Sequence, residues 1–151
     1  MRDQQSNAPQ NKTACSRELH NSINDKQVVE DLKILHSFIG AMQLQVIVEM
    51  CHSEERRYIY STLRALADTV SNMPVTYETD GTDALVHLHY FTASCDWYIV
   101  ELDIEGDQLQ TFGKADLGMG FPELGYINLP EILECGAELD LHWSPRRLSE
   151  I

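Results

Sequence analysis

The spacing of apolar residues changes once along the chain, from a helical to an alternating period. Between residues 24 and 73, apolar side chains recur at every third or fourth position, which is typical of amphipathic helices. After Pro74 they alternate with polar side chains, which is typical of strands. We therefore predict an α+β fold, in which an N-terminal helical segment is followed by a mostly antiparallel β-sheet with one short helix.

The helical segment is expected to divide at Gly40 into an apolar stripe over residues 28–39 and a second short stretch over residues 41–51. A third helix is predicted to start after Ser53, because serine caps helix N-termini. It should end before Pro74, because proline disfavours helical geometry in the preceding residue. The stripes of the first two stretches could pair within the chain or across a homodimer.

Several short stretches of the C-terminal half alternate as strands do. The predicted strands cover residues 84–91, 97–104, 109–114, 126–127 and 138–143. Asn128 is expected to cap a short helix that Gly136 ends. Strict alternation would place Val86, Leu88 and Tyr90 on one face of the first strand, and Trp97, Ile99, Glu101 and Asp103 on one face of the second. The aromatic residues Trp97, Tyr98, Phe112, Phe121, Tyr126 and Trp143 are assigned to the core.

These patterns divide the chain into three parts. Residues 1–22 are polar, and we predict a flexible tail. Residues 23–73 form the helical segment, and residues 74–151 form an acidic antiparallel sheet domain. A hydrophobic content of 43% is enough for a real core in a chain of 151 residues.

The acidic residues are concentrated in the predicted sheet. The chain has a net charge of -13, and residues 78–140 hold fourteen acids and a single base, Lys114. Such charge disfavours direct binding to nucleic acid or to an anionic membrane, and it favours a basic partner that itself binds nucleic acid. Improved solubility is the alternative reason for an acidic composition.

One group of these acids is predicted to bind the partner. Glu101, Asp103, Glu105 and Asp107 alternate around one hairpin, and residues two steps apart on a strand lie about 7 Å from each other. A row with this spacing could imitate the phosphates of a nucleic acid, or it could be an ordinary solvated strand face that blocks edge pairing. The full predicted partner-binding set is Glu101, Asp103, Glu105, Asp107, Asp96, Glu123 and Glu134.

Other chemistries find little support. His87 and His89 would point to one side of a strand, but no third ligand is evident, so a structural role is favoured over a metal site. Neither a phosphate-binding loop nor a G-x-S-x-G motif occurs, and we expect a non-enzyme without cofactor. The four cysteines form no C-x-x-C pair, and no secretory or membrane-spanning segment is evident. A cytoplasmic protein with free thiols is therefore expected.

The chain resembles a bacterial domain family of unknown function, number 2958 of its series, over roughly residues 54–151. The resemblance is carried by H-L-H-Y-F at residues 87–91, D-W-Y at 96–98, E-L-G-Y-I at 123–127 and A-E-L-D-L-H-W at 137–143. It implies a gene of plasmids, phages and conjugative elements, and it implies no catalytic residue.

Together, charge and resemblance lead to two functional hypotheses. In the first, the protein binds and inhibits a basic nucleic-acid-binding defence complex of the host, as anti-CRISPR or anti-restriction proteins do. In the second, it is a non-enzymatic adaptor of plasmid or phage transfer or replication that acts through its helical part.

Overall fold

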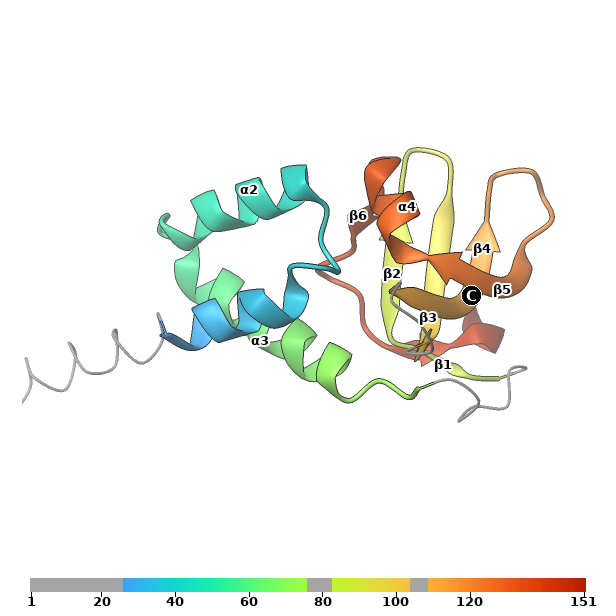
Figure 1. The fold of residues 1–151 in the computed structure, drawn as a ribbon, viewed down its shortest axis with the longest axis horizontal. Coiled ribbons are helices and arrows are strands. Elements are labelled where there is room, and N and C mark those ends of the chain that lie inside the picture. Colours follow the sequence, from blue (N-terminus) through green and yellow to red (C-terminus); the bar gives the residue numbers. More distant parts are fainter. Residues whose placement is uncertain (1–25, 76–82, 104–108) are drawn as a thin grey trace, which may run out of the picture.

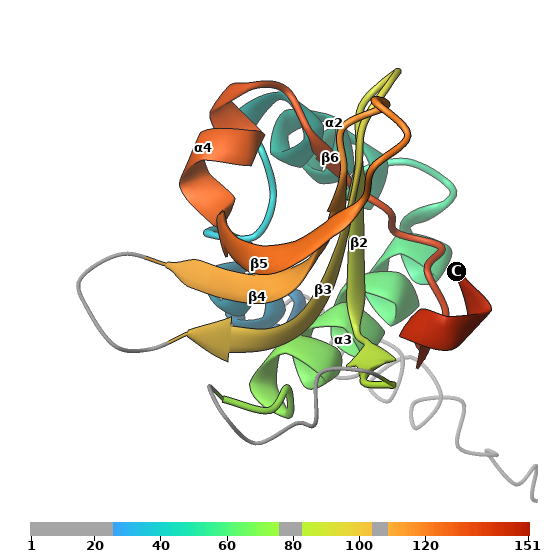
Figure 2. The same cartoon turned by 90° about the vertical axis from the view of Figure 1, so that its right-hand side faces the viewer.

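The computed structural model describes residues 26–75, 83–103 and 109–151, and its architecture is α+β, as predicted. The helices lie to one side of an antiparallel sheet of five strands (Figures 1 and 2). A helical segment at residues 26–35 comes first. It is followed by α2 (Ala41–Cys51), α3 (Arg56–Ser71), β1 (Leu85–Val86), β2 (Leu88–Phe91), β3 (Asp96–Asp103), β4 (Gln110–Asp116), β5 (Glu123–Asn128), α4 (Leu129–Glu134), β6 (Glu138–Leu139), β7 (Arg146–Arg147) and the 3-10 turn Leu148–Glu150. The predicted tail, residues 1–22, lies outside the described residues.

The helical part divides where the sequence predicts. Gly40 has an extended conformation and is the N-cap residue of α2. Ser53, however, does not cap α3, which begins three residues later at Arg56. The Ser53 hydroxyl instead accepts a hydrogen bond from the backbone N–H of Glu55 (3.1 Å). Ser53 therefore stabilises the turn between α2 and α3, a local role that serine side chains also favour.

The five-stranded sheet has the order β5-β4-β3-β2-β6, so β5 and β6 are its edge strands. A separate two-stranded ribbon joins β1 to β7. The short helix α4 follows β5 as predicted, and its Asn128 cap accepts a hydrogen bond from the backbone N–H of Glu131 (3.3 Å). Gly136 follows the helix with a φ of 86°, a conformation that favours glycine after a helix end.

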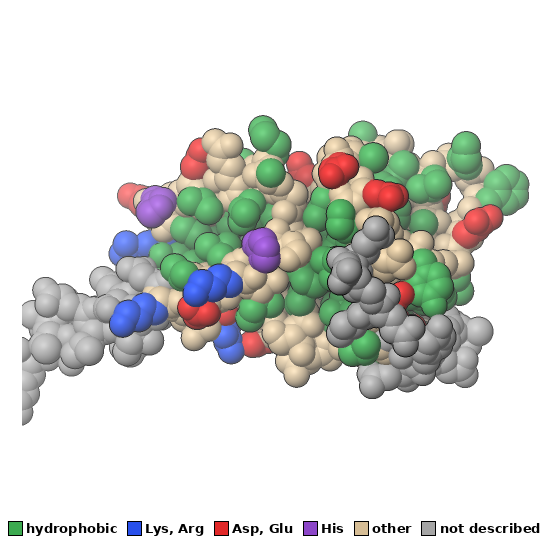
Figure 3. Space-filling view, viewed as in Figure 1, with side chains coloured by type: hydrophobic (Ala, Val, Ile, Leu, Met, Phe, Trp, Pro, Cys, Tyr) green, Lys and Arg blue, Asp and Glu red, His purple; other side chains and the backbone are tan. Residues whose placement is uncertain are grey.

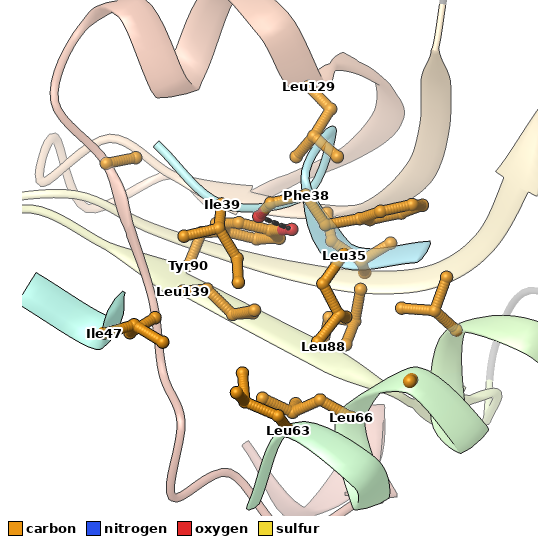
Figure 4. Packing of buried hydrophobic residues seen from close by; sticks show 14 of the residues in the cluster. Leu35, Phe38, Ile39, Ile47, Leu63, Leu66, Leu88, Tyr90, Leu129 and Leu139 are labelled. Carbon is orange, nitrogen blue, oxygen red and sulfur yellow. Dashed lines mark hydrogen bonds between the residues drawn. The ribbon is translucent and has the colours of Figure 1, made fainter. Parts of the chain in front are cut away.

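Helices and sheet share one apolar core (Figure 4). Leu35 and Phe38 come from the first helical segment, Leu63 comes from α3, and Leu88 and Tyr90 come from β2. The Tyr90 hydroxyl donates a hydrogen bond to the backbone oxygen of Phe38 (2.8 Å) inside this core. Because each part buries its apolar face against the other, helices and sheet are expected to fold as one unit.

The predicted first strand is broken at His87. Val86 packs in a second, smaller core, whereas Leu88 packs in the main core. The prediction that Val86 and Leu88 share a face is therefore wrong, because β1 pairs with β7 while β2 pairs with β3 and β6. The small core comprises Ala84, Val86, Val100 and Leu148, with Tyr98 and Trp143 packed against it.

An extra residue, Val100, forms a bulge in β3. Ile99 lies opposite Gly113, and the next pair along β3 begins at Glu101. Since the extra residue reverses the alternation, Glu101 lies on the face turned away from the helices, whereas Ile99 packs in the main core. We call this face the outer face. The predicted common face of Trp97, Ile99, Glu101 and Asp103 is wrong for this reason.

Candidate protein-binding surface

Glu101 does not lie on the surface, although it heads the predicted acidic row. Its side chain is 6% exposed, and its Oε2 atom has no hydrogen-bond partner among the described residues. The neighbouring bulge residue, Val100, turns into the small core, and Glu101 is buried beside it. A carboxylate that is buried in this way cannot present its charge to a partner's groove, so the row does not extend to Glu101.

Asp96 and Asp103 lie on β3 in different surroundings. The Oδ1 atom of Asp96 is 2.8 Å from Nε2 of His89, so this carboxylate already has a partner within the chain. Asp103 is half-buried at the end of β3. Both residues fall on the outer face, since they are separated from the core-facing Trp97 and Ile99 by strand alternation and by the bulge.

The remaining predicted residues lie elsewhere. Glu123 is exposed at the start of β5, opposite Ala115, whose side chain packs against the main core. It therefore lies on the helix-facing side of the sheet. Glu134 is exposed at the end of α4. Glu105 and Asp107 lie outside the described residues. The structure thus distributes the described members of the predicted set over more than one face, and these members do not form one row.

The regional excess of acid nevertheless persists in the folded chain. The described residues of the sheet part, 83–103 and 109–151, hold eleven acids and three bases, whereas residues 26–75 hold six acids and five bases. In Figure 3 the blue Lys and Arg side chains gather over the helical part, and the sheet part shows red side chains. Lys114 turns away from β5, because its Nζ atom contacts the backbone oxygen of Ile151 (3.3 Å) and lies over the Tyr98 ring.

A group of exposed apolar side chains stands on the β4–β5 hairpin. We call this group the hairpin patch, and it comprises Leu117, Met119, Phe121, Leu124 and Tyr126. Phe121 is 81% exposed and Tyr126 is 56% exposed, so the prediction that both belong to the core is wrong. Green side chains stand at the tip of this hairpin in Figure 3. Large side chains that are exposed next to one another mark interaction sites more often than scattered ones do.

His89 of the H-x-H motif lies between two carboxylates. His89 contacts Asp96 through Nε2 (2.8 Å) and Asp140 through Nδ1 (3.1 Å). Its ring also stacks on Tyr98, with centroids 4.9 Å apart and planes 8° apart. No group of three metal-ligating residues occurs within the described part of the chain. Through these contacts His89 connects β2, β3 and the segment after β6.

The sequence does not reveal that these residues meet with Trp143. The Trp143 ring lies 4.9 Å from the His89 ring, its Nε1 atom donates to the backbone oxygen of Val86 (3.1 Å), and Arg146 lies over its face at 4.4 Å. Burial raises the pKa of Tyr98, and the nearby Asp96 raises it further. Three of the segments that carry the family resemblance, residues 87–91, 96–98 and 137–143, thus meet on the outer face. Nothing in the sequence besides their occurrence together indicates this contact.

His87 should make the stability of the protein depend on pH. It is half-buried, and desolvation lowers its pKa from the usual 6.5. The unfolded chain then binds the proton more readily, so this contribution to stability is complete above pH 6.5 and is lost as the pH falls below it. We expect His87→Gln to flatten the fall in melting temperature between neutral and mildly acidic pH, measured by circular dichroism. Equal slopes for variant and wild type would contradict this role.

Among the described residues, no helix is both long and apolar enough to cross a membrane. Cys51, Cys95 and Cys135 are free thiols in the structure. Fold and surface together define an α+β protein whose five-stranded sheet is covered by helices on one face and carries an acidic, partly apolar hairpin.

The chain belongs to the family described as "Protein of unknown function (DUF2958)", whose model matches residues 58–145. The match begins within α3 and extends through the sheet. No curated protein matches the chain. No solved structure matches it either.

Proposed function

We propose that this protein is a non-enzymatic, cytoplasmic inhibitor from a mobile genetic element, which binds a basic nucleic-acid-binding protein of the host. Partners of this chemistry occur in CRISPR and restriction complexes, whose grooves attract acidic surfaces. The form of this hypothesis that relies on a regular row of phosphate-like carboxylates is not retained, because Glu101 is buried. The proposal rests on acids of β5 and α4 instead.

The observation that carries the proposal is the combination of exposed acids on β5 and α4 with exposed apolar side chains on the β4–β5 hairpin. Glu123, Glu131 and Glu134 are exposed and form no ion pair within the described ranges. Glu123 begins β5, which also carries Leu124 and Tyr126 of the hairpin patch, and the other two acids lie on α4, which directly follows β5. Protein interfaces commonly join an apolar centre to a charged rim, and an acidic rim selects basic partners and speeds their association.

The proposal predicts that neutralising these acids weakens capture of the partner. The triple variant Glu123→Gln, Glu131→Gln, Glu134→Gln should retain about tenfold less basic protein from a nuclease-treated bacterial lysate at low salt, because each exposed charge contributes up to ~1 kcal/mol. Quantitative mass spectrometry of the bound fraction measures the loss. The matched control, Glu49→Gln, Glu54→Gln, Glu55→Gln, removes the same charge from exposed positions of the helical part and should capture normally. Equal capture by both variants would remove the acidic rim from the mechanism.

One observation favours the adaptor hypothesis as a second candidate. The helix α2 exposes Met42 (79%) and Val46 (54%), which lie one turn apart. A partner could therefore dock on the helical part. In the same capture experiment, loss of the partner with Met42→Gln, Val46→Gln and not with the acidic triple variant would favour an adaptor over an inhibitor.

A further inference from the structure

The two edges of the sheet differ in how their backbone groups are covered. At the β6 edge, the side-chain amide of Gln43 donates to the backbone oxygen of Leu139 (2.8 Å) and accepts from its backbone N–H (3.0 Å). This amide occupies the place that a further strand would take. At the other edge, β5 pairs with β4 alone among the strands that the structure describes. An edge strand of this kind can accept an additional strand.

The side chains of β5 define what a strand at this edge would meet. Leu124 and Tyr126 lie on the outer face, since they pair with Lys114 and Phe112 of β4, and Tyr126 packs edge-on against Phe112 with centroids 5.5 Å apart. A strand added at this edge would therefore lie beside two exposed apolar side chains of the outer face.

We propose that β5 accepts an extended segment of the partner as an added strand, in which apolar residues alternate with lysine or arginine. The proposal rests on the proposed function and specifies its mode of contact. Main-chain hydrogen bonds would provide affinity, and the alternating side chains would provide specificity. Apolar side chains of the segment would lie beside Leu124 and Tyr126, and its basic side chains would face the carboxylates of Glu123, Glu131 and Glu134.

Charge decides between such a partner and a second copy of this chain. A copy paired through its own β5 would bring a second set of the same uncompensated acids to the interface, in a protein of net charge -13. Like charges at close range destabilise strand pairing and association. A basic segment brings the complementary sign instead.

The test uses the full chain and a synthetic peptide of about twelve residues that alternates lysine and valine, which is long enough to span β5. Amide hydrogen exchange followed by NMR reports on each backbone N–H. We expect the outward-facing amides of β5 to exchange at least about tenfold more slowly in the complex. A peptide of the same sequence with all its backbone nitrogens methylated keeps the charge and should lose this protection, because neither of its edges can donate main-chain hydrogen bonds to β5. On the protein side, Leu124→Ser should weaken peptide binding, whereas Val29→Ser in the first helical segment, which is 52% exposed, should not.

Three results would overturn strand addition. The first is equal binding of both peptides without slower exchange in β5, and the second is binding of neither peptide. The third is a β5-mediated dimer of the free chain, detected by sedimentation. None of them decides the proposed function, which fails separately if the acidic triple variant captures basic proteins as well as the wild type does.

Discussion

Leu35→Ala should lower the free energy of unfolding by about 3 kcal/mol and should destabilise the sheet as much as the helices. Leu35 is fully buried in the first helical segment and packs in the core that also holds Leu88 and Tyr90 of β2. Truncation leaves a cavity between the two parts. Both tryptophans of the chain, Trp97 and Trp143, lie in the sheet part, so their fluorescence follows the sheet while far-ultraviolet circular dichroism also follows the helices.

The matched control is Val29→Ala in the same helical segment. Val29 is 52% exposed, so this variant should stay within about 0.5 kcal/mol of the wild type. If Leu35→Ala shifted the dichroism and left the tryptophan transition in place, the helices and the sheet would unfold independently. The same shared core means that a chain lacking residues 1–50 should not keep its sheet folded, so point variants are the better way to separate the two candidate functions.

Gly113→Ala should be at least as damaging, with a loss of about 3 kcal/mol or more. Gly113 lies opposite Ile99 at the bulge of β3, and a Cβ atom there would overlap the backbone oxygen of Tyr98. Both strands are internal, so neither can move away without disturbing a neighbour. Urea denaturation followed by tryptophan fluorescence measures the loss.

Gly125→Ala provides the control within the same sheet, because Gly125 is the direct β5 partner of Gly113. Its added Cβ atom meets nothing within 4 Å. We expect a change of less than about 1 kcal/mol, in the stabilising direction, since glycine is unfavourable inside strands. Equal losses for the two variants would mean that close approach of the β3 backbone is not the reason for glycine at position 113.

The sequence predicted the fold where local physics decides it. The change of period placed the helices before the sheet, and Asn128 and Gly136 bounded α4. The prediction from the sequence failed where pairing between distant strands determines the structure. The break at His87 arises because β1 pairs with β7, some sixty residues later, and the bulge at Val100 arises from packing in the small core. Neither event changes the alternation of the residues themselves, so a strict period of two placed Glu101 and Val86 on the wrong faces.

The candidate surface was predicted only in part. Composition located the acidic excess in the sheet region, and that excess remains in the described residues. The hairpin patch was missed because Phe121 and Tyr126 were assigned to the core by their residue type. For Phe121 the available signal was its place beside the glycines and Pro122 of a turn, since side chains in a turn beyond the end of a strand leave the packed layers. Tyr126 lies within β5, and its exposure follows from the pairing that turns it to the outer face.

The central claim is that the exposed carboxylates beside β5 bind to the partner, at the same surface of the partner that binds nucleic acid. A competition experiment tests this most directly. The captured partner is purified and bound to a labelled nucleic-acid fragment. The complex is then titrated with this protein or with a variant, and the fluorescence anisotropy of the label reports release of the fragment. We predict stoichiometric displacement by the wild type and by the helical control variant, and about tenfold weaker displacement by Glu123→Gln, Glu131→Gln, Glu134→Gln. A ternary complex with nucleic acid still bound, or equal displacement by all three proteins, would contradict the claim.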